Sequence, residues 1–300
     1  MELARGVIEP TFVPKIDQFE SVFKAAAKER FRFDQVSVAS VLVVTDLDVA
    51  GAGTFAESVR TFLGVLGDDV SWDVVAGGDL GDVGEMLGRV EHDKPDLICT
   101  YRNLNSDAGK WRHSLGDRLD VLTQATPTPV LVFPRPDERE GWGGNAGGAG
   151  IGTLRVSVLT DHLTGDDRLI SYGVHFTAPG GELLLTHVED SGVFERYMQV
   201  ISKIPEIDTE RARLTILDQL LKEPREYIES CAQVLEQAEI DRTVLAVVRL
   251  GHRLSEYLAL IEEEGVGLVV LNTKDDDQLA MHGLAYPLAI ELRHVPLLML

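Results

Sequence analysis

The chain has 300 residues, a hydrophobic content of 44% and a formal net charge of -21 at neutral pH. This length predicts about two domains, at roughly 150 residues each, and the hydrophobic content is sufficient for a core in both. The acidic charge argues against nucleic acid or an anionic membrane as the main partner, because both require a basic face. No apolar run approaches the ~20 residues that a membrane span needs.

Cysteine usage and the amino-terminal sequence both favour a cytoplasmic location. The segment MELARGVIEP lacks the apolar core of a secretory signal. The two cysteines, Cys99 and Cys231, fall within a predicted strand and a predicted helix, where a small buried hydrophobic side chain is the ordinary interpretation. We therefore expect a reduced compartment and no disulfide.

Residues 1–35 are predicted to form an amino-terminal helical arm. Apolar side chains recur at helical spacing at Ile16, Phe19, Phe23 and Ala26. One interpretation is a helix that packs on its own domain. The other is an arm that docks on a partner subunit, since Phe12, Phe31 and Phe33 add apolar surface outside the helical stripe.

A first α/β domain is predicted over residues 36–134. A buried strand at 38–45 ends in Asp46, and the segment from Gly51 to Thr54 opens a helix. A glycine pair between strand and helix can bind phosphate, but the third glycine of the dinucleotide fingerprint is missing, so a tight turn and helix cap are expected. A strand at 70–75, a helix at 80–91 and a closing strand–helix–strand unit follow, which gives four strands.

The glycine-rich segment 135–152 is interpreted as a solvated linker, because prolines, charges and glycines dominate it. A second domain over 153–300 then repeats the pattern. A strand at 154–160 ends in Asp161, and further strands are predicted at 182–188 and 243–248, with helices at 169–176, 209–238 and 253–263. Pro224 is expected to begin a new helix or to kink the existing one.

Both domains close with the same unit. The first copy reads DLICTY, a polar loop, Gly116, a helix and the strand 128–133; the second reads GLVVLN, a polar loop, Gly283, a helix and the strand 295–300. Each glycine stands 17 residues before the last residue of its strand. Continuous apolar runs joined by a helix predict parallel strands buried on both faces, and hence two tandem, open, doubly wound parallel sheets of Rossmann-like α/β/α type.

This arrangement resembles a tandem member of the universal stress protein family, over 36–133 and 154–300, with the first half shortened by one β-α unit. In ATP-binding members of that family the aspartate that ends the first strand lies near the adenine. A glycine series after the fourth strand, Gly-x2-Gly-x9-Gly-[Ser/Thr], holds the phosphates on backbone N–H groups at a helix start.

The resemblance implies degenerate nucleotide sites in both halves. The candidate residues that it marks are Asp46, Arg102, Asn103 and Gly116 in the first half, and Asp161, Asn272, Thr273 and Gly283 in the second. Only the last glycine of the series is present each time. A carboxylate about 5 Å from a phosphate oxygen costs roughly 3 kcal/mol at an effective dielectric near 20. Asp117 and the run Asp275 to Asp277 therefore disfavour ATP, for which weak binding at most is expected, whereas a weak site for AMP or an adenosine group near Asp46 or Asp161 stays open.

No motif predicts a resident metal or a catalytic centre. The three consecutive aspartates cannot all converge on one cation and match no calcium loop, so a solvated loop is expected. His113 and His282 lie near the surviving glycines without a cysteine or histidine cluster. His162 follows Asp161, but no motif places a nucleophile beside it.

Three functions follow in order of preference. The first is a non-catalytic stress-response or signalling protein that acts through assembly, as a homodimer, and through an unknown protein partner. In the family, the last strand commonly lies at such an interface. The second is a ligand-gated regulator that binds an adenine nucleotide in one half. The third, more distant, is a nucleotide hydrolase of the wider superfamily.

Overall fold

The computed structural model describes residues 31–104, 114–136, 151–160, 167–273 and 283–300. From Phe31 onward the chain forms one compact unit. The predicted arm lies almost wholly outside the described residues, as does most of the predicted linker.

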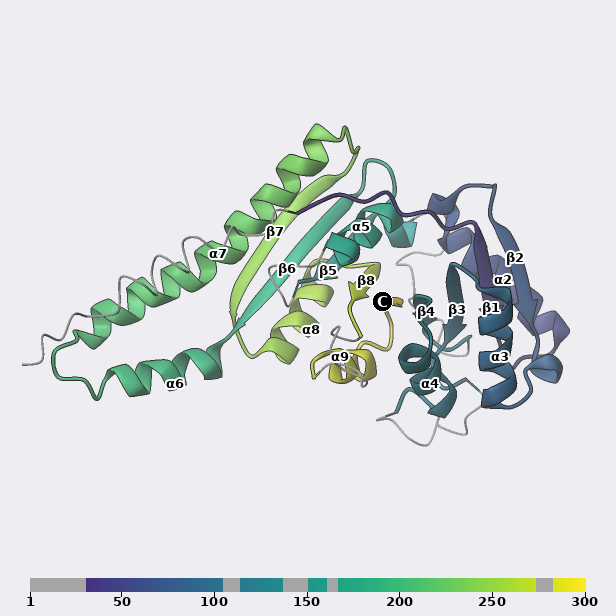
Figure 1. Cartoon of the computed structure of the whole chain (residues 1–300), viewed down its shortest axis with the longest axis horizontal. Coiled ribbons are helices and arrows are strands. Elements are labelled where there is room, and N and C mark those ends of the chain that lie inside the picture. The colour runs from purple at the N-terminus through teal and green to yellow at the C-terminus, as the bar shows by residue number, and fades with distance from the viewer. Residues whose placement is uncertain (1–30, 105–113, 137–150, 161–166, 274–282) are drawn as a thin grey trace, which may run out of the picture. The chain divides into compact units, whose positions relative to one another are not determined.

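The described residues form one nine-stranded sheet of order β2-β1-β3-β4-β9-β8-β5-β6-β7 (Figure 1). The first half of the chain contributes β1 (Ser40–Val44), β2 (Ser71–Val75), β3 (Leu97–Tyr101) and β4 (Val130–Phe133). The second half contributes β5 (Arg155–Leu159), β6 (Glu182–Asp190), β7 (Thr243–Gly251), β8 (Leu268–Leu271) and β9 (Leu297–Met299). The predicted α/β class is confirmed, with four strands from one half and five from the other.

Helices connect the strands as right-handed crossovers require. In the first half these are α2 (Val49–Phe62), α3 (Val83–Asp93) and α4 (Asp117–Ala125). In the second they are α5 (Asp167–Phe176), α6 (Ser191–Ile201), α7 (Thr209–Gln237), α8 (Arg253–Glu263) and α9 (Ala285–Glu291). With right-handed connections α2, α5 and α7 cover one face of the sheet, and α3, α4, α8 and α9 cover the other.

The two halves repeat each other down to single hydrogen bonds. The order β2-β1-β3-β4 matches β6-β5-β8-β9, and the registers agree, with Val41 opposite Leu97 and Val156 opposite Leu268. At the end of the first strand of each half a threonine donates its backbone N–H and its hydroxyl to the neighbouring strand. Thr45 donates to the Val75 carbonyl at 3.0 and 3.1 Å, and Thr160 donates to the Thr186 carbonyl at 2.9 and 3.0 Å.

The halves join edge to edge through an antiparallel pairing of β4 with β9, in which Leu131 lies opposite Leu298. The strands of the two halves therefore run in opposite directions. The carboxyl ends of β1 to β4 lie at one end of the sheet, and those of β5 to β9 lie at the other. The closing strand of the chain, which resemblance places at a dimer interface, is paired on both sides within the chain. At the junction Phe62 packs edge-on against Phe133 at 5.3 Å between ring centroids.

Close backbone packing fixes the start of the second half. A Cβ added to Gly152 would lie 2.1 Å from the Phe62 ring, and one added to Gly267 would lie 2.1 Å from the Gly152 carbonyl oxygen. The last residue of the predicted linker is therefore packed between α2 and the start of β8. The boundaries predicted at 134 and 153 remain a prediction, because the sheet continues across them.

Residues 31–35, assigned to the arm by sequence, pack on the second half instead. Phe31 is buried in the core, and the Asp34 N–H donates to the Ser171 hydroxyl on α5 at 3.2 Å. In Figure 1 this stretch passes α5 on its way to β1. The stretch ahead of β1 therefore ties the first half to the second.

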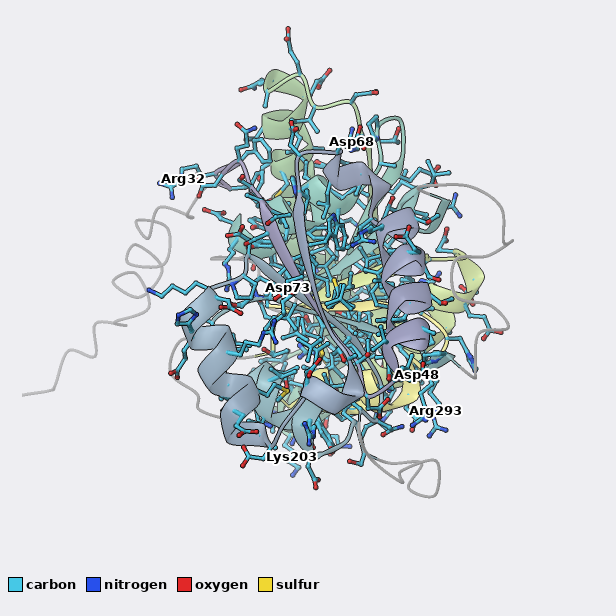
Figure 2. All side chains as sticks on the ribbon, turned by 90° about the vertical axis from the view of Figure 1, so that its right-hand side faces the viewer. Arg32, Asp48, Asp68, Asp73, Lys203 and Arg293 are labelled. Carbon is cyan, nitrogen blue, oxygen red and sulfur yellow. The ribbon has the colours of Figure 1, made fainter. Side chains whose placement is uncertain are left out.

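Three local predictions need correction. Gly51 and Gly53 do not form a turn before a helix, because α2 already begins at Val49 and Asp48 is its N-cap, accepting from the Gly51 N–H at 2.8 Å (Figure 2). The loop expected after β6 contains α6, which Asp190 caps. One helix, α7, continues through Pro224, so of the two alternatives predicted there the new helix is wrong and the kink stays a prediction.

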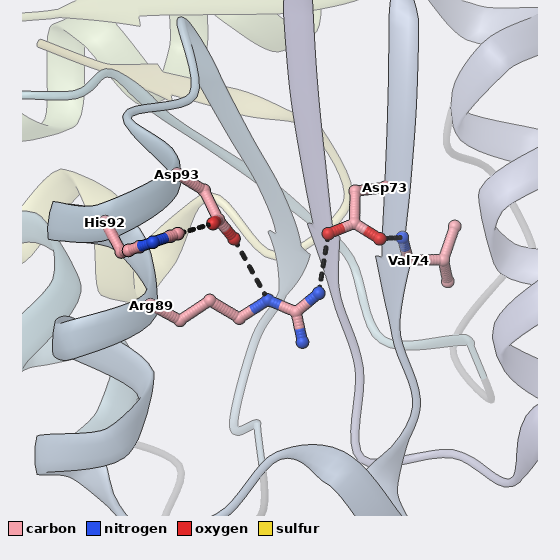
Figure 3. A network of polar contacts seen from close by, with 5 residues as sticks. All are labelled: Asp73, Val74, Arg89, His92 and Asp93. Carbon is pink, nitrogen blue, oxygen red and sulfur yellow. Dashed lines mark hydrogen bonds and ion pairs between the residues drawn. The ribbon is translucent and has the colours of Figure 1, made fainter.

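A polar network ties α3 to the edge strand β2 (Figure 3). Arg89 donates to Asp73 at 2.6 Å and to Asp93 at 3.3 Å, and His92 contacts Asp93 at 2.8 Å. The hydrogen bond to His92 is the main cause that lowers the pKa of Asp93, and the hydrogen bond that Arg89 donates to Asp73 is the main cause that raises the pKa of Arg89. The groups are largely exposed, so the network orients α3 more than it stabilises the fold.

Candidate functional site

Open doubly wound sheets bind ligands where the strand order reverses, at the carboxyl ends of the strands. In the first half this point lies between β1 and β3, and in the second between β5 and β8. Asp46 follows β1 and Tyr101 ends β3, so both flank the first switch point. Thr160 and Asn272 flank the second.

A tyrosine closes the first switch point. The Tyr101 hydroxyl donates a short hydrogen bond to the Asp46 carboxylate, and the Asp46 backbone N–H donates to the same hydroxyl at 3.1 Å. The Tyr101 ring is buried and packs edge-on against Phe55 at 5.0 Å. Gly77 lies so close on the other side that an added Cβ would stand 2.4 Å from the Asp46 carbonyl oxygen. Asp46, which the resemblance places near an adenine, thus forms hydrogen bonds within the protein.

Burial and the hydrogen bond to Asp46 both raise the pKa of Tyr101. The phenol is therefore neutral at physiological pH and acts as a donor to the carboxylate. The Asp46 carboxylate therefore has a hydrogen-bond donor within the protein and needs none from a ligand.

The two polar residues after β3 are also committed to the fold. Arg102 is buried and donates to the carbonyls of Ala289 and Leu292 at the carboxyl end of α9. Asn103 has a positive φ of 57° and donates its N–H to the Leu115 carbonyl at 2.9 Å. Leu104 and Leu115, which flank the loop between β3 and α4, are both fully buried.

The start of α4 carries its own negative charge. Gly116 is the N-cap, with φ 97°, and provides no side-chain cap, while Asp117 and Asp120 stand in the first turn. Burial, together with the nearby Asp117, raises the pKa of Asp120. Two carboxylates already occupy the positive end of this helix, so it offers little to a phosphate.

The second switch point is described in part. Asp161 lies outside the described residues, as do His162, Asp275 to Asp277, His113 and His282. Asn272 is half-buried; Thr273 is buried and donates its N–H and hydroxyl to the Leu300 carbonyl at 2.9 and 2.6 Å. Gly283 is exposed, and an added Cβ there would meet nothing within 4 Å.

The registers show how the two points differ. Cys99 and Val270 face the equivalent residues of β1 and β5, so Tyr101 is equivalent to Asn272 and Arg102 to Thr273. The second half has a small amide where the first has a phenol ring. Sequence reasoning marked Asn272 but missed Tyr101; the signal was an aromatic at the end of a strand beside a strand ending in aspartate.

One histidine near the second point was also missed. His187 on β6 is buried, with Nδ1 2.8 Å from the Thr160 carbonyl and Nε2 3.3 Å from Glu189. The hydrogen bond from His187 is the main cause that lowers the pKa of Glu189. Both ring nitrogens have partners in the fold, so His187 has a structural role.

A cavity of about 40 Å³ lies between β1, β2 and α3, lined by Leu42, Val75, Glu85, Met86 and others, with room for a few waters at most. No cluster of three metal-binding side chains occurs in the described part of the chain. Nor does any helix in that part have the length and apolar character to cross a membrane.

The geometry defines a class of protein that is built from open, doubly wound α/β units. Comparison with solved structures supports that fold. A universal stress protein from Archaeoglobus fulgidus DSM 4304 superimposes with a TM-score of 0.51 at 15% identity, covering 87% of this chain and 95% of that one. A functionally unknown protein from Pseudomonas aeruginosa PAO1 matches with a TM-score of 0.49 at 12% identity, covering 88% and 92%.

Sequence comparisons find no matching family model and no matching curated protein. The match to a solved structure nevertheless shows that the chain has the fold of a universal stress protein, as the closing repeats predicted. At this identity the likeness concerns the fold, and function has to be argued from the residues.

Proposed function

We propose that this protein is a non-catalytic, cytoplasmic stress-response or signalling protein that acts through assembly and a protein partner. The observation that carries the proposal is the closed first switch point, where Tyr101 holds Asp46. Arg102 is buried against α9, and the start of α4 carries two carboxylates. Together these contacts of the described residues favour a structural role for this point over a nucleotide site.

One observation favours a second candidate function. Asn272 stands at the position in the second half that is equivalent to Tyr101 in the first, so a small amide replaces the phenol ring at that position. An adenosine group needs hydrogen-bond partners and no phosphate cradle, which makes AMP a better candidate than ATP. The alternative is therefore a regulator with one nucleotide site, in the second half. The third candidate, a hydrolase, has no nucleophile or base placed by the described residues.

Calorimetric titration of the full chain with ATP, ADP and AMP, each with and without magnesium, separates the candidates. Under the preferred function no nucleotide binds with a micromolar dissociation constant, which would correspond to about -8 kcal/mol. No phosphate is released from ATP in a parallel hydrolysis assay.

Matched variants decide between the halves if heat is observed. Micromolar binding that disappears in Asp161→Ala and survives in Asp46→Ala supports the regulator and refutes the preferred function. Loss of binding in Asp46→Ala alone would contradict both, because it would place the ligand where Tyr101 now lies.

A further inference from the structure

The exposed apolar side chains of the described residues are concentrated at one place. Of the seven large apolar residues with high exposure, five lie between 197 and 214: Tyr197, Val200, Ile204, Ile207 and Leu214. We call these five the tip surface. In Figure 1, α6 and the first turns of α7 lie beyond the ends of β6 and β7. A cluster of this kind marks an interaction surface, whereas isolated exposed apolar residues do not.

The stripe on α7 shows that the tip surface is built for burial. Leu214, Leu217 and Leu221 lie on the same side of this helix as Ile228, Cys231 and Leu235. The second three residues are buried, whereas Leu214 is 70% exposed and its two neighbours are only half-buried. The apolar face therefore continues past the point where the sheet stops covering it.

The tip is held in one conformation before any partner arrives. Arg213 on α7 binds both carboxylate oxygens of Glu195 on α6, at 2.5 and 2.9 Å, and its guanidinium lies over the Phe194 ring. Phe194 and Met198 are the buried residues of α6, and Asp208 caps α7. A preorganised surface loses little entropy on binding.

Charge decides which kind of partner fits. Residues 191–225 contain six basic and six acidic side chains, so the segment is neutral in a chain of net charge -21. The basic residues are Arg196, Lys203, Arg211, Arg213, Lys222 and Arg225, and the acidic ones are Glu195, Glu206, Asp208, Glu210, Asp218 and Glu223. A second copy meets strong repulsion over most of this protein but not here, and a neutral tip offers no attraction to a basic partner or an anionic membrane.

We infer that the tip surface is the site at which a second copy of this chain docks, helix hairpin against helix hairpin about a twofold axis. This rests on the assembly function proposed above and names its surface. An isologous contact uses the same residues on both copies. The alternative edge, β9, is already paired with β4 in the chain, and the first half has no counterpart of the α6–α7 hairpin.

Molar mass by light scattering on the full chain tests the inference, with Leu214→Glu as the probe. The wild type should be a dimer, and the variant should raise the dissociation constant by about 100-fold, because a charge enters the interface twice. Val49→Glu is the matched control: Val49 is 80% exposed on α2, away from the hairpin, and its variant should remain a dimer. Circular dichroism should be unchanged in both.

The outcomes separate the inference from the proposed function. A dimer that persists in Leu214→Glu and in Val200→Glu overturns the inference and leaves assembly intact, whereas a monomeric wild type overturns both. If Leu214→Glu does not fold, Val200→Glu and hydrogen exchange of the wild type decide. Protection of residues 197–214 should grow with protein concentration; protection independent of concentration would place a segment of the same chain on the tip and refute a second copy.

Discussion

Tyr101 and Asn272 occupy equivalent positions, and in the first half Tyr101 spans the switch point to the aspartate that follows the first strand. Its hydroxyl is both donor to the Asp46 carboxylate and acceptor from the Asp46 N–H. Since the phenol is buried, this pair is part of the core. The end of β3 beside the first switch point is therefore a packing position.

Replacing Tyr101 with phenylalanine removes the hydroxyl and keeps the ring. The Asp46 carboxylate and N–H each lose a partner, so the free energy of unfolding should fall by about 1–3 kcal/mol. Urea unfolding followed by circular dichroism measures this change. Because the ring still fills the space, nucleotide binding should not appear.

Tyr197→Phe provides the control, since Tyr197 is 61% exposed on α6 and loss of its hydroxyl should change stability by less than about 0.5 kcal/mol. Equal effects of the two substitutions would mean that the Tyr101–Asp46 pair contributes nothing specific.

At the residue scale the sequence predicted where the candidate residues lie in the fold, but not which groups their side chains contact. Asp46 was found because it ends an apolar run, and the structure places it at the end of β1, beside the switch point. Its partner was hidden because Tyr101 is 55 residues away and meets Asp46 only after β1 and β3 pair. Arg102 was read as a possible phosphate ligand, a role that remains untested, and the carbonyls of α9 that it contacts lie 187 and 190 residues further on.

Helix α4 carries an unfavourable charge in its first turn. Burial and Asp117 raise the pKa of Asp120, so the folded state favours the protonated acid. The contribution of this group to stability is therefore full at low pH and is lost as the pH rises through its raised pKa.

Asp120→Asn should consequently stabilise the protein at neutral pH. The gain should be below about 1 kcal/mol, since the helix dipole favours the aspartate and the side chain is partly solvated. It should shrink as the pH falls through the pKa of Asp120, because the wild-type acid is then neutral too. Thermal unfolding between pH 4 and 8 measures both trends.

The matched control is Asp68→Asn, an exposed aspartate before β2, for which no comparable gain is expected. A gain for Asp120→Asn that is largest at pH 4 would have the wrong sign and would refute this account of α4.

Elements were predictable where period and caps agreed. The bounds of α8 match the predicted 253–263, because its apolar spacing is regular and a strand precedes it. Helix α6 was missed, although Asp190 as N-cap and the spacing of Phe194, Met198 and Ile201 indicate it. Its apolar face is only partly buried, with Tyr197 and Val200 exposed beside the buried Phe194 and Met198, so the apolar period is weak. The 29-residue α7 passes through Pro224, where tertiary packing outweighs the local preference.

The duplication was visible at the scale of the whole molecule because apolar runs, glycines and prolines repeat in order. The way in which the two halves join could not be predicted from the sequence. Strands β4 and β9 are apolar on both faces whichever edge they pair with, so composition could not show that they pair with each other. One continuous sheet results, and we expect the described halves to unfold together.

Arg102 offers a test of that coupling, because it extends from the first half to the last carbonyls of α9 in the second. Arg102→Met keeps the apolar stem and removes the charged donor, leaving buried carbonyls with fewer partners. We expect a loss of about 2–4 kcal/mol and a broader urea transition in which the halves no longer unfold as one. Arg32→Met, at an exposed ion pair with Asp34, should cost less than about 0.5 kcal/mol. An unchanged, single transition in Arg102→Met would show that the β4–β9 pairing couples the halves without this arginine.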